Sequence, residues 1–300
     1  MNSIEAMAQD IGRQLDDLPR LVLPAPAGNV AFVGSGDSYA AALAACYFSS
    51  GRATCWRPAD VISDPSLLVG RSACFVSISG RTRSNIQAAS AARKAGVPTV
   101  AITADGKSPL ASACDSVFAL DFKSAGKTSG TISFAASMLA CTHLATQGKT
   151  GCPADLNEIY ARASKAAGRL AGRVRTGSII MLGDSLLFSV AMYGALKFNE
   201  VFGSRAQAYP LEEFFHAPLF GLKCNDQVIV LGTKGDDVAL ARRVNGLPVD
   251  CSASVPVESL FYAVFFIQHL VLAVAKKRRL QECHFMRDKR LLKTSSKVIY

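Results

Sequence analysis

The sequence predicts an α/β protein made of two tandem doubly wound lobes, each built on a parallel sheet. Three observations predict this class. The chain has 300 residues and is 50% hydrophobic, which is enough to bury the cores of two domains. Apolar, strand-like runs alternate with longer helical stretches, as in parallel strands joined by right-handed helical crossovers. One strand–turn–helix pattern also occurs twice, about half a chain apart.

The first half of the chain shows the alternation most clearly. Short apolar runs predict strands at Val30 to Gly34, Ala73 to Ser79, Thr99 to Thr103 and Ser116 to Leu120. Longer stretches predict helices at Asp37 to Ser50, Thr82 to Ala95 and Thr131 to Thr146. We therefore expect a doubly wound unit in this half, together with an N-terminal helix.

The repeated pattern is a Gly-Asp-Ser turn that follows an apolar strand and opens a long Ala-rich helix. It occurs at Gly36 to Ser38 and at Gly183 to Ser185, 147 residues apart. A second strand follows in each half, the later one at Gln227 to Gly232. Because the strand, the turn and the helix recur together, the pattern indicates a duplicated lobe.

The lobes are expected to meet near Gly148 to Pro153, where a helix from Ala154 to Leu170 crosses over. We predict that lobe 1 covers residues 1–150 and lobe 2 covers residues 151–300.

Hydroxyl side chains gather where the strand from Ala73 ends. The loop SerIleSerGlyArgThr holds Ser77, Ser79 and Thr82 around Gly80. Glycine lets the backbone approach an anion closely, and the helix that follows offers unpaired amides and the positive end of its dipole. A simple helix cap needs only one such hydroxyl. Three hydroxyls and a glycine within six residues therefore favour a phosphate-binding loop, and we expect phosphate in lobe 1 only, since lobe 2 lacks this loop.

Lys197 and Glu200 are three residues apart in the helical stretch GlyAlaLeuLysPheAsnGlu, so they project from one face. The rest of this helix is apolar on most sides, which leaves little surface for a solvated pair and favours a functional one. His216 follows sixteen residues after Glu200, and Glu213, one turn before it, is placed to fix the imidazole tautomer. From spacing alone, a structural histidine is the favoured interpretation of His216.

Composition narrows the function classes. The nine cysteines include no CxxC pair and no His/Cys cluster, which indicates a reducing cytosol and no metal site. The net charge of +10 fits a phosphorylated small molecule, and the scattered basic residues do not indicate a nucleic-acid partner. The apolar run from Ser259 to Ala275 contains Gln268 and His269, so we expect a buried core helix and no membrane span. No motif implies a cofactor.

Taken together, the two Gly-Asp-Ser turns, the SISGRT loop, the GALKFNE helix and the segment AQAYPLEEFFHAP resemble the sugar isomerase (SIS) family. The similarity is greatest to the isomerase domain of glucosamine-6-phosphate synthases, and it runs from about Val30 to the C-terminus. The resemblance implies two flavodoxin-like SIS lobes. It also implies that Ser77, Ser79 and Thr82 bind the sugar phosphate beside Gly80, with help from Ser38.

The same resemblance implies the catalytic residues. Lys197 and Glu200 match the family's Lys-x-x-Glu pair, and His216 matches its ring-opening histidine. A lysine near the C-terminus forms a Schiff base in the synthases; Lys293 or Lys297 matches it here, and we favour Lys293. The sequence departs from the family at Ala217, usually Gly, and at Arg81, often Glu.

The resemblance implies a cytoplasmic enzyme that interconverts fructose 6-phosphate and glucosamine 6-phosphate by ring opening and proton transfer between C1 and C2. It also implies a homodimer with shared active sites. The chain has Asn2 where the synthases have their glutaminase cysteine, so we expect ammonia to come from solution or from a separate glutaminase. The alternatives are a non-catalytic phosphosugar-binding regulator and a simple aldose-ketose isomerase or deglycase.

Overall fold

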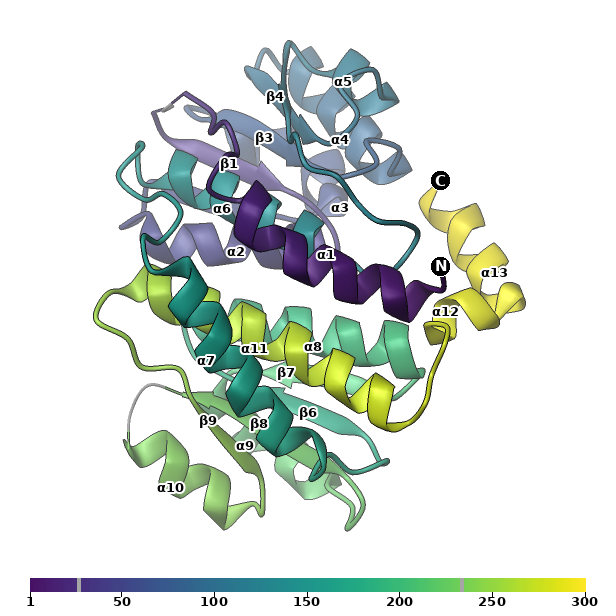
Figure 1. The fold of residues 1–300 in the computed structure, drawn as a ribbon. Helices are drawn as coiled ribbons and strands as arrows, with labels where there is room; N and C mark the ends of the chain where they lie inside the picture. Colours follow the sequence, from purple (N-terminus) through teal and green to yellow (C-terminus); the bar gives the residue numbers. More distant parts are fainter. Residues whose placement is uncertain (26–27, 233–234) are drawn as a thin grey trace. The chain divides into compact units, whose positions relative to one another are not determined.

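The computed structural model describes residues 1–25, 28–232 and 235–300. Within these residues it contains two parallel sheets, one of five strands and one of four, with helices between successive strands (Figure 1). The predicted α/β class with two tandem lobes is therefore confirmed.

The residues group into two compact units, which we name after their sheets. The first-sheet unit comprises Asp16–Lys123, Ile132–Cys152 and Arg290–Tyr300, and the second-sheet unit comprises Met1–Leu15, Ser124–Thr131 and Pro153–Lys289. The chain thus passes between the units several times. The division into domains at residues 1–150 and 151–300 stays a prediction.

The first-sheet unit has the strand order β2-β1-β3-β4-β5. The interior strand β1 is buried along its whole length, as expected for a parallel strand with helices on both faces. Val33 and Phe75 from neighbouring strands join Ala89 of a helix in the core. The elements are β1 (Val30–Val33), α2 (Asp37–Phe48), β2 (Ala53–Trp56), α3 (Pro58–Ser63), β3 (Ser72–Val76), α4 (Arg83–Lys94), β4 (Thr99–Thr103), α5 (Pro109–Ala113), β5 (Ser116–Ala119), α6 (Ile132–Ala145) and α13 (Lys289–Ile299), with a short 3-10 turn at Pro65–Leu68.

The second-sheet unit has the order β7-β6-β8-β9, which repeats the order of the first four strands of the other sheet. Its core packs Leu182 and Val230 from adjacent strands against Phe214. The elements are α1 (Ser3–Asp17), α7 (Leu156–Ala171), β6 (Ile179–Leu182), α8 (Leu186–Phe202), β7 (Ala206–Tyr209), α9 (Leu211–His216), β8 (Gln227–Gly232), α10 (Gly235–Arg243), β9 (Leu247–Asp250), α11 (Pro256–Lys277) and α12 (His284–Arg287), with a 3-10 turn at Pro218–Gly221.

The register of the repeat differs from the sequence prediction. Gly36 has φ 55° and ψ −128°, and Ser185 has φ 50° and ψ −128°; each stands directly before the first residue of its helix. Ser185 therefore corresponds to Gly36, and the offset is 149 residues. The predicted offset of 147 residues is wrong by two. It aligned the two Gly-Asp-Ser turns residue by residue, but these turns do not occupy the same position relative to the helix that follows.

Helix α11 contains the apolar run that we predicted to be a core helix. By length and composition it is the one helix among residues 1–25, 28–232 and 235–300 that could cross a membrane, yet 78% of its most apolar window is buried within the protein. Its polar residue Gln268 is buried too, and it exchanges hydrogen bonds with Gln14 of α1. This burial and pairing are those of a core helix.

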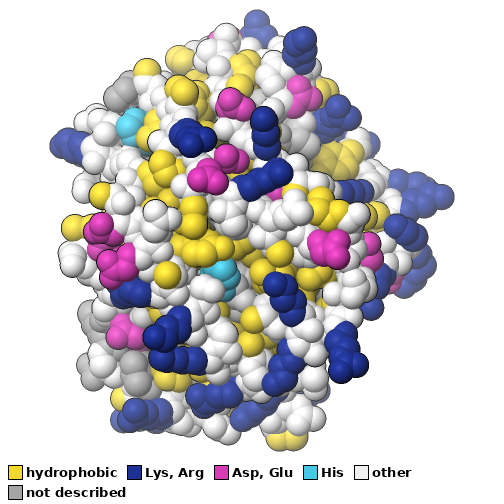
Figure 2. Space-filling model, viewed as in Figure 1, with side chains coloured by type: hydrophobic (Ala, Val, Ile, Leu, Met, Phe, Trp, Pro, Cys, Tyr) yellow, Lys and Arg dark blue, Asp and Glu magenta, His cyan; other side chains and the backbone are white. Residues whose placement is uncertain are grey.

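The basic residues are spread over the surface. Figure 2 shows Lys and Arg side chains on much of the visible face, with Asp and Glu among them. A denser group lies at the right of the view, where Figure 1 places α13. That helix carries Lys289, Arg290, Lys293 and Lys297 and buries none of its residues.

Candidate functional site

The predicted phosphate loop lies between β3 and α4, at the carboxyl end of its strand, where ligands bind in open parallel sheets. The Ser77 and Thr82 hydroxyl oxygens are 3.1 Å apart and share a hydrogen bond. Thr82 precedes the first residue of α4, but its side chain caps no amide of that helix. The Ser79 hydroxyl accepts a 3.3 Å hydrogen bond from the Arg81 amide. The loop thus brings the hydroxyls of Ser77 and Thr82 together at the start of a helix.

Gly80 is required by the shape of this loop. Its φ is +59°, and a Cβ added there would collide with the side chain of Ser108. The Gly80 carbonyl accepts a 2.9 Å hydrogen bond from the Leu110 amide, and its own amide donates to the Ser77 carbonyl at 3.0 Å. The loop is therefore packed against the start of α5 by backbone contacts that leave no room for a side chain.

Ser38 lies in the first turn of α2, after β1. The strands β1 and β3 are neighbours in the sheet, so the turn with Ser38 and the loop with Ser77 follow adjacent strand ends. Gly34 is in close contact with Ser38, since a Cβ on Gly34 would lie 3.2 Å from the Ser38 Cβ. Ser38 is therefore held at the same edge of the sheet as the loop.

Arg81 stands at the wall of a cavity beside the loop. Its side chain is 67% exposed and lies 3.9 Å from the Asp105 carboxylate. Arg83 and Lys107 line the same cavity, of about 460 Å³, as does Tyr300 near the end of α13. The departure from the family at Arg81 thus places a cation in a basic pocket next to the hydroxyl loop.

The pair Lys197 and Glu200 lies on α8 in the second-sheet unit. The Lys197 Nζ donates a 2.7 Å hydrogen bond to the Glu200 Oε2, and the two side chains are 2% and 35% exposed. The Lys197 ammonium also lies over the ring of Tyr193, 5.2 Å from its centroid. This is not an idle pair in solvent: a buried cation holds a carboxylate that keeps part of its surface open.

Ser129 completes this group and was missed by the sequence reasoning. Its hydroxyl donates a 2.6 Å hydrogen bond to the same Glu200 Oε2. Ser129 is 1% exposed and belongs to the segment Ser124–Thr131, which groups with the second-sheet unit. The only signal in the sequence is a run of small hydroxyl residues before a buried helix, and the contact spans 71 residues.

His216 is the last residue of α9 and is largely exposed. Its Nε2 lies 3.7 Å from the Glu212 Oε1, with the two side chains 68% and 90% exposed. The predicted partner Glu213 is therefore wrong. Glu212 precedes His216 by four residues, which puts the two side chains on one face of the helix. Among the described residues, His216 forms no hydrogen bond or ion pair with Glu200 or Lys197.

The tail lysines lie on α13. Lys293 and Lys297 are exposed and form no hydrogen bond or ion pair with the described residues. They group with the first-sheet unit, as does the phosphate loop. A choice between them stays a prediction.

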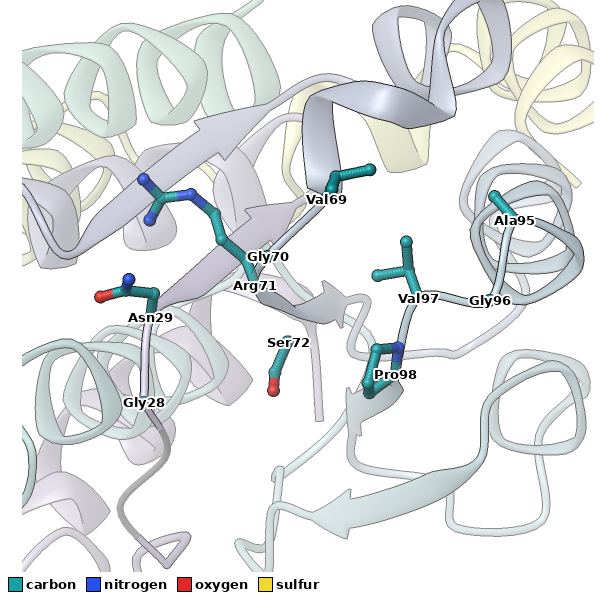
Figure 3. Close-up of a pocket in the computed structure, with 10 residues that line it drawn as sticks. All are labelled: Gly28, Asn29, Val69, Gly70, Arg71, Ser72, Ala95, Gly96, Val97 and Pro98. Atoms are coloured by element: carbon teal, nitrogen blue, oxygen red, sulfur yellow. The ribbon is translucent and has the colours of Figure 1, made fainter.

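A second cavity lies at the opposite edge of the first sheet (Figure 3). It measures about 440 Å³ and is lined by Asn29, Arg71 and Pro98 at the amino ends of β1, β3 and β4. The Arg71 guanidinium donates a 2.7 Å hydrogen bond to the Arg52 carbonyl. None of the predicted site residues lines it, so we place the candidate site at the carboxyl edge, where the hydroxyl loop is.

The comparison with protein families decides the nature of the first lobe. The family profile described as "SIS domain" matches residues 25–147. This part of the chain is similar to the SIS domain. The matched range contains the loop at Ser77 to Thr82, and the recognition made from the motifs is confirmed. No curated protein sequence matches the chain.

Several solved structures resemble this chain over nearly its whole length. The C-terminal domain of glucosamine-fructose-6-phosphate aminotransferase from Francisella tularensis has 17% identity and a TM-score of 0.69, covering 92% of this chain and 98% of that chain. Glucosamine-6-phosphate deaminase from Thermotoga maritima has 19% identity and a TM-score of 0.73, with coverage of 92% and 96%. Tagatose-6-phosphate ketose/aldose isomerase from Escherichia coli has 18% identity and a TM-score of 0.67, with coverage of 92% and 88%. At these identities the likeness establishes the fold alone.

Proposed function

We propose that this protein is a phosphosugar isomerase-type enzyme that interconverts fructose 6-phosphate, with ammonia, and glucosamine 6-phosphate. The observation that carries the proposal is the group around Glu200. A half-buried carboxylate held by a buried lysine and a buried serine is the arrangement that proton transfer between neighbouring carbons needs. A purely ligand-binding regulator has no use for it.

The substrate phosphate is assigned to the loop. Ser77, Ser79 and Thr82 supply hydroxyl donors, and Gly80 lets backbone amides approach the phosphoryl oxygens. Ser38 follows the neighbouring strand and is assigned a further contact. The charge of Arg81 in the adjacent basic pocket favours the dianion. Binding the phosphate fixes the substrate so that its other end presents C1 and C2 in one register.

The chemistry is assigned to the second-sheet unit. His216 carries the proton that opens the sugar ring, and it comes from the partner subunit if the protein is the homodimer that we propose. Glu200 then removes a proton from one of C1 and C2 and returns it to the other. The ammonium of Lys197 stabilises the negative charge that develops on oxygen in the enediol or enolamine.

The amination step is assigned to a tail lysine. The amine of Lys293, or of Lys297, condenses with the C2 ketone to give an imine and releases one water. Ammonia then displaces the lysine to give the sugar imine, and the proton transfer yields glucosamine 6-phosphate. We propose that ammonia comes from solution or from a separate glutaminase.

The experiment incubates the purified protein with fructose 6-phosphate plus ammonium, and separately with glucosamine 6-phosphate, and identifies the products. We expect interconversion of the two. Glu200→Gln is expected to abolish turnover and to leave the affinity for the sugar phosphate within about twofold. The matched control is Glu158→Gln, which changes an exposed glutamate of α7 in the same unit and should keep full activity.

Other outcomes separate the alternatives. Conversion between ketose and aldose phosphates without amination would replace the proposal by simple isomerisation. Binding of sugar phosphates without any turnover would replace it by a regulatory role. Full activity of Glu200→Gln would remove Glu200 from the mechanism.

A further inference from the structure

We infer that Ser129 is a positioning residue that fixes the Glu200 carboxylate so that its Oε1 atom carries the transferred proton. The inference rests on the proposed function, and it adds to it a residue and a choice of oxygen. It also gives a positioning role to Ser129, which lies on the segment Ser124–Thr131, more than twenty residues before the second-sheet unit resumes at Pro153.

The two donors of the group bind the same oxygen atom. Lys197 donates to Oε2 at 2.7 Å and Ser129 donates to Oε2 at 2.6 Å. Within the described residues, Oε1 accepts no hydrogen bond. An oxygen that accepts two strong bonds is a weaker proton acceptor, because both bonds favour its charged form. The proton therefore goes to Oε1, the oxygen that accepts neither of these two bonds.

Two donors fix the carboxylate better than one. With Lys197 alone, the carboxylate of Glu200 is free to rotate about its last carbon–carbon bond, since a lysine ammonium is a rotatable donor on a flexible chain. Ser129 approaches from a different segment and removes that freedom. Proton transfer requires the oxygen and the carbon atom within about 3 to 3.5 Å and aligned, so this restriction acts on the rate rather than on binding.

The segment that carries Ser129 is itself held on both sides. The Tyr193 hydroxyl donates to the Gly130 carbonyl at 2.8 Å, and Gln268 donates to the Thr131 carbonyl at 3.3 Å. On the other side, the Thr128 hydroxyl donates to the Ser3 carbonyl at 2.7 Å.

Near the start of the segment, Asp10 of α1 accepts hydrogen bonds from the Ser124 hydroxyl and the Ala125 amide at 2.7 and 2.5 Å. Helices α1, α8 and α11 of one unit thus share the task of keeping Ser129 in place.

The test uses the full chain and the conversion assay described above. Ser129→Ala is expected to lower kcat about 10- to 100-fold, the value of a hydrogen bond to a charged group. KM for the sugar phosphate should stay within about twofold. The matched control is Thr131→Val, two residues away, because the Thr131 hydroxyl is buried and has no hydrogen-bond partner. It should leave both constants unchanged.

A coupling measurement separates positioning from a general loss of structure. Glu200→Asp shortens the side chain by one methylene, so its carboxylate no longer reaches Ser129. In that background Ser129→Ala should lower kcat less than twofold. If Ser129→Ala acted only by a general loss of structure, its effect on kcat would instead multiply with the effect of Glu200→Asp.

The outcomes are distinct. A wild-type chain that converts no sugar phosphate overturns the proposed function, and this inference with it. Two results overturn the inference alone, provided that the wild-type chain is active. One is a kcat of Ser129→Ala equal to that of Thr131→Val. The other is a loss of kcat from Ser129→Ala that is as large in the Glu200→Asp background as in the wild type.

Discussion

Replacing Gly80 by alanine tests the geometry of the phosphate loop. The left-handed φ of +59° costs an alanine about 1–2 kcal/mol. The new methyl would occupy the place of the Ser108 side chain, whose hydroxyl accepts a hydrogen bond from the Ala111 amide at 3.3 Å and caps α5. Losing that cap costs about 1 kcal/mol, and forcing the backbone of Ser108 to move costs about 1–3 kcal/mol. The sum is a destabilisation of about 3–6 kcal/mol.

Thermal unfolding measures this effect. For a chain of 150–250 residues each kcal/mol lowers the midpoint by about 2–4 °C, so we expect Gly80→Ala to lower it by about 6–24 °C. The control is Gly96→Ala, directly after α4, where φ is +75° and a Cβ would meet no atom within 4 Å. It should pay only the conformational cost of about 1–2 kcal/mol. Equal midpoints for the two variants would show that the close contact between Gly80 and Ser108 does not exist.

Two further predictions concern charge. Burial, and then the nearby Lys276, lower the pKa of His269 to about 4. The unfolded chain binds a proton at His269 below about pH 6.5, so the free energy of unfolding should fall by up to about 3 kcal/mol as the pH drops from 6.5 to 4. Denaturant unfolding of His269→Gln should not show this fall. An identical pH profile for the two proteins would contradict the assignment. Arg81→Glu should raise KM for fructose 6-phosphate about 3- to 10-fold at low salt, with kcat unchanged and a smaller effect at high salt. Arg93→Glu, near the other end of α4, is its control, and an effect of equal size there would remove Arg81 from phosphate attraction.

The sequence was sufficient for the central strands and the loop, and the reason is physical. The strands β1, β3 and β4 are buried on both faces, so they appear as continuous apolar runs. The edge strands β2 and β7 have four residues each and are partly exposed, which leaves neither an apolar run nor a clear alternation. For that reason the sequence does not predict these two strands.

The group around Glu200 was only half predictable. Lys197 and Glu200 are close in sequence, so helical spacing alone places them together. Ser129 contacts Glu200 because the segment Ser124–Thr131 groups with the second-sheet unit, although the residues before and after it belong to the first-sheet unit. No local sequence pattern predicts such a contact. The partner of His216 was wrong for a smaller reason: Glu212 and Glu213 both fit about one helical turn, and only the orientation of α9 decides between them.

The position of Glu200 follows from the place where the two lobes stop being alike. The first residues of α2 and α8 correspond at an offset of 149, and α2 ends after 12 residues whereas α8 continues for 17. Lys197 thus matches Phe48, the last residue of α2, and Glu200 matches Gly51, which lies beyond that helix with φ +83°. The extra turn of α8 is ended by Gly203, whose left-handed φ of +67° and close approach to His284 admit no side chain. The extra turn of α8 therefore supplies the helical position of Glu200, which the first lobe lacks.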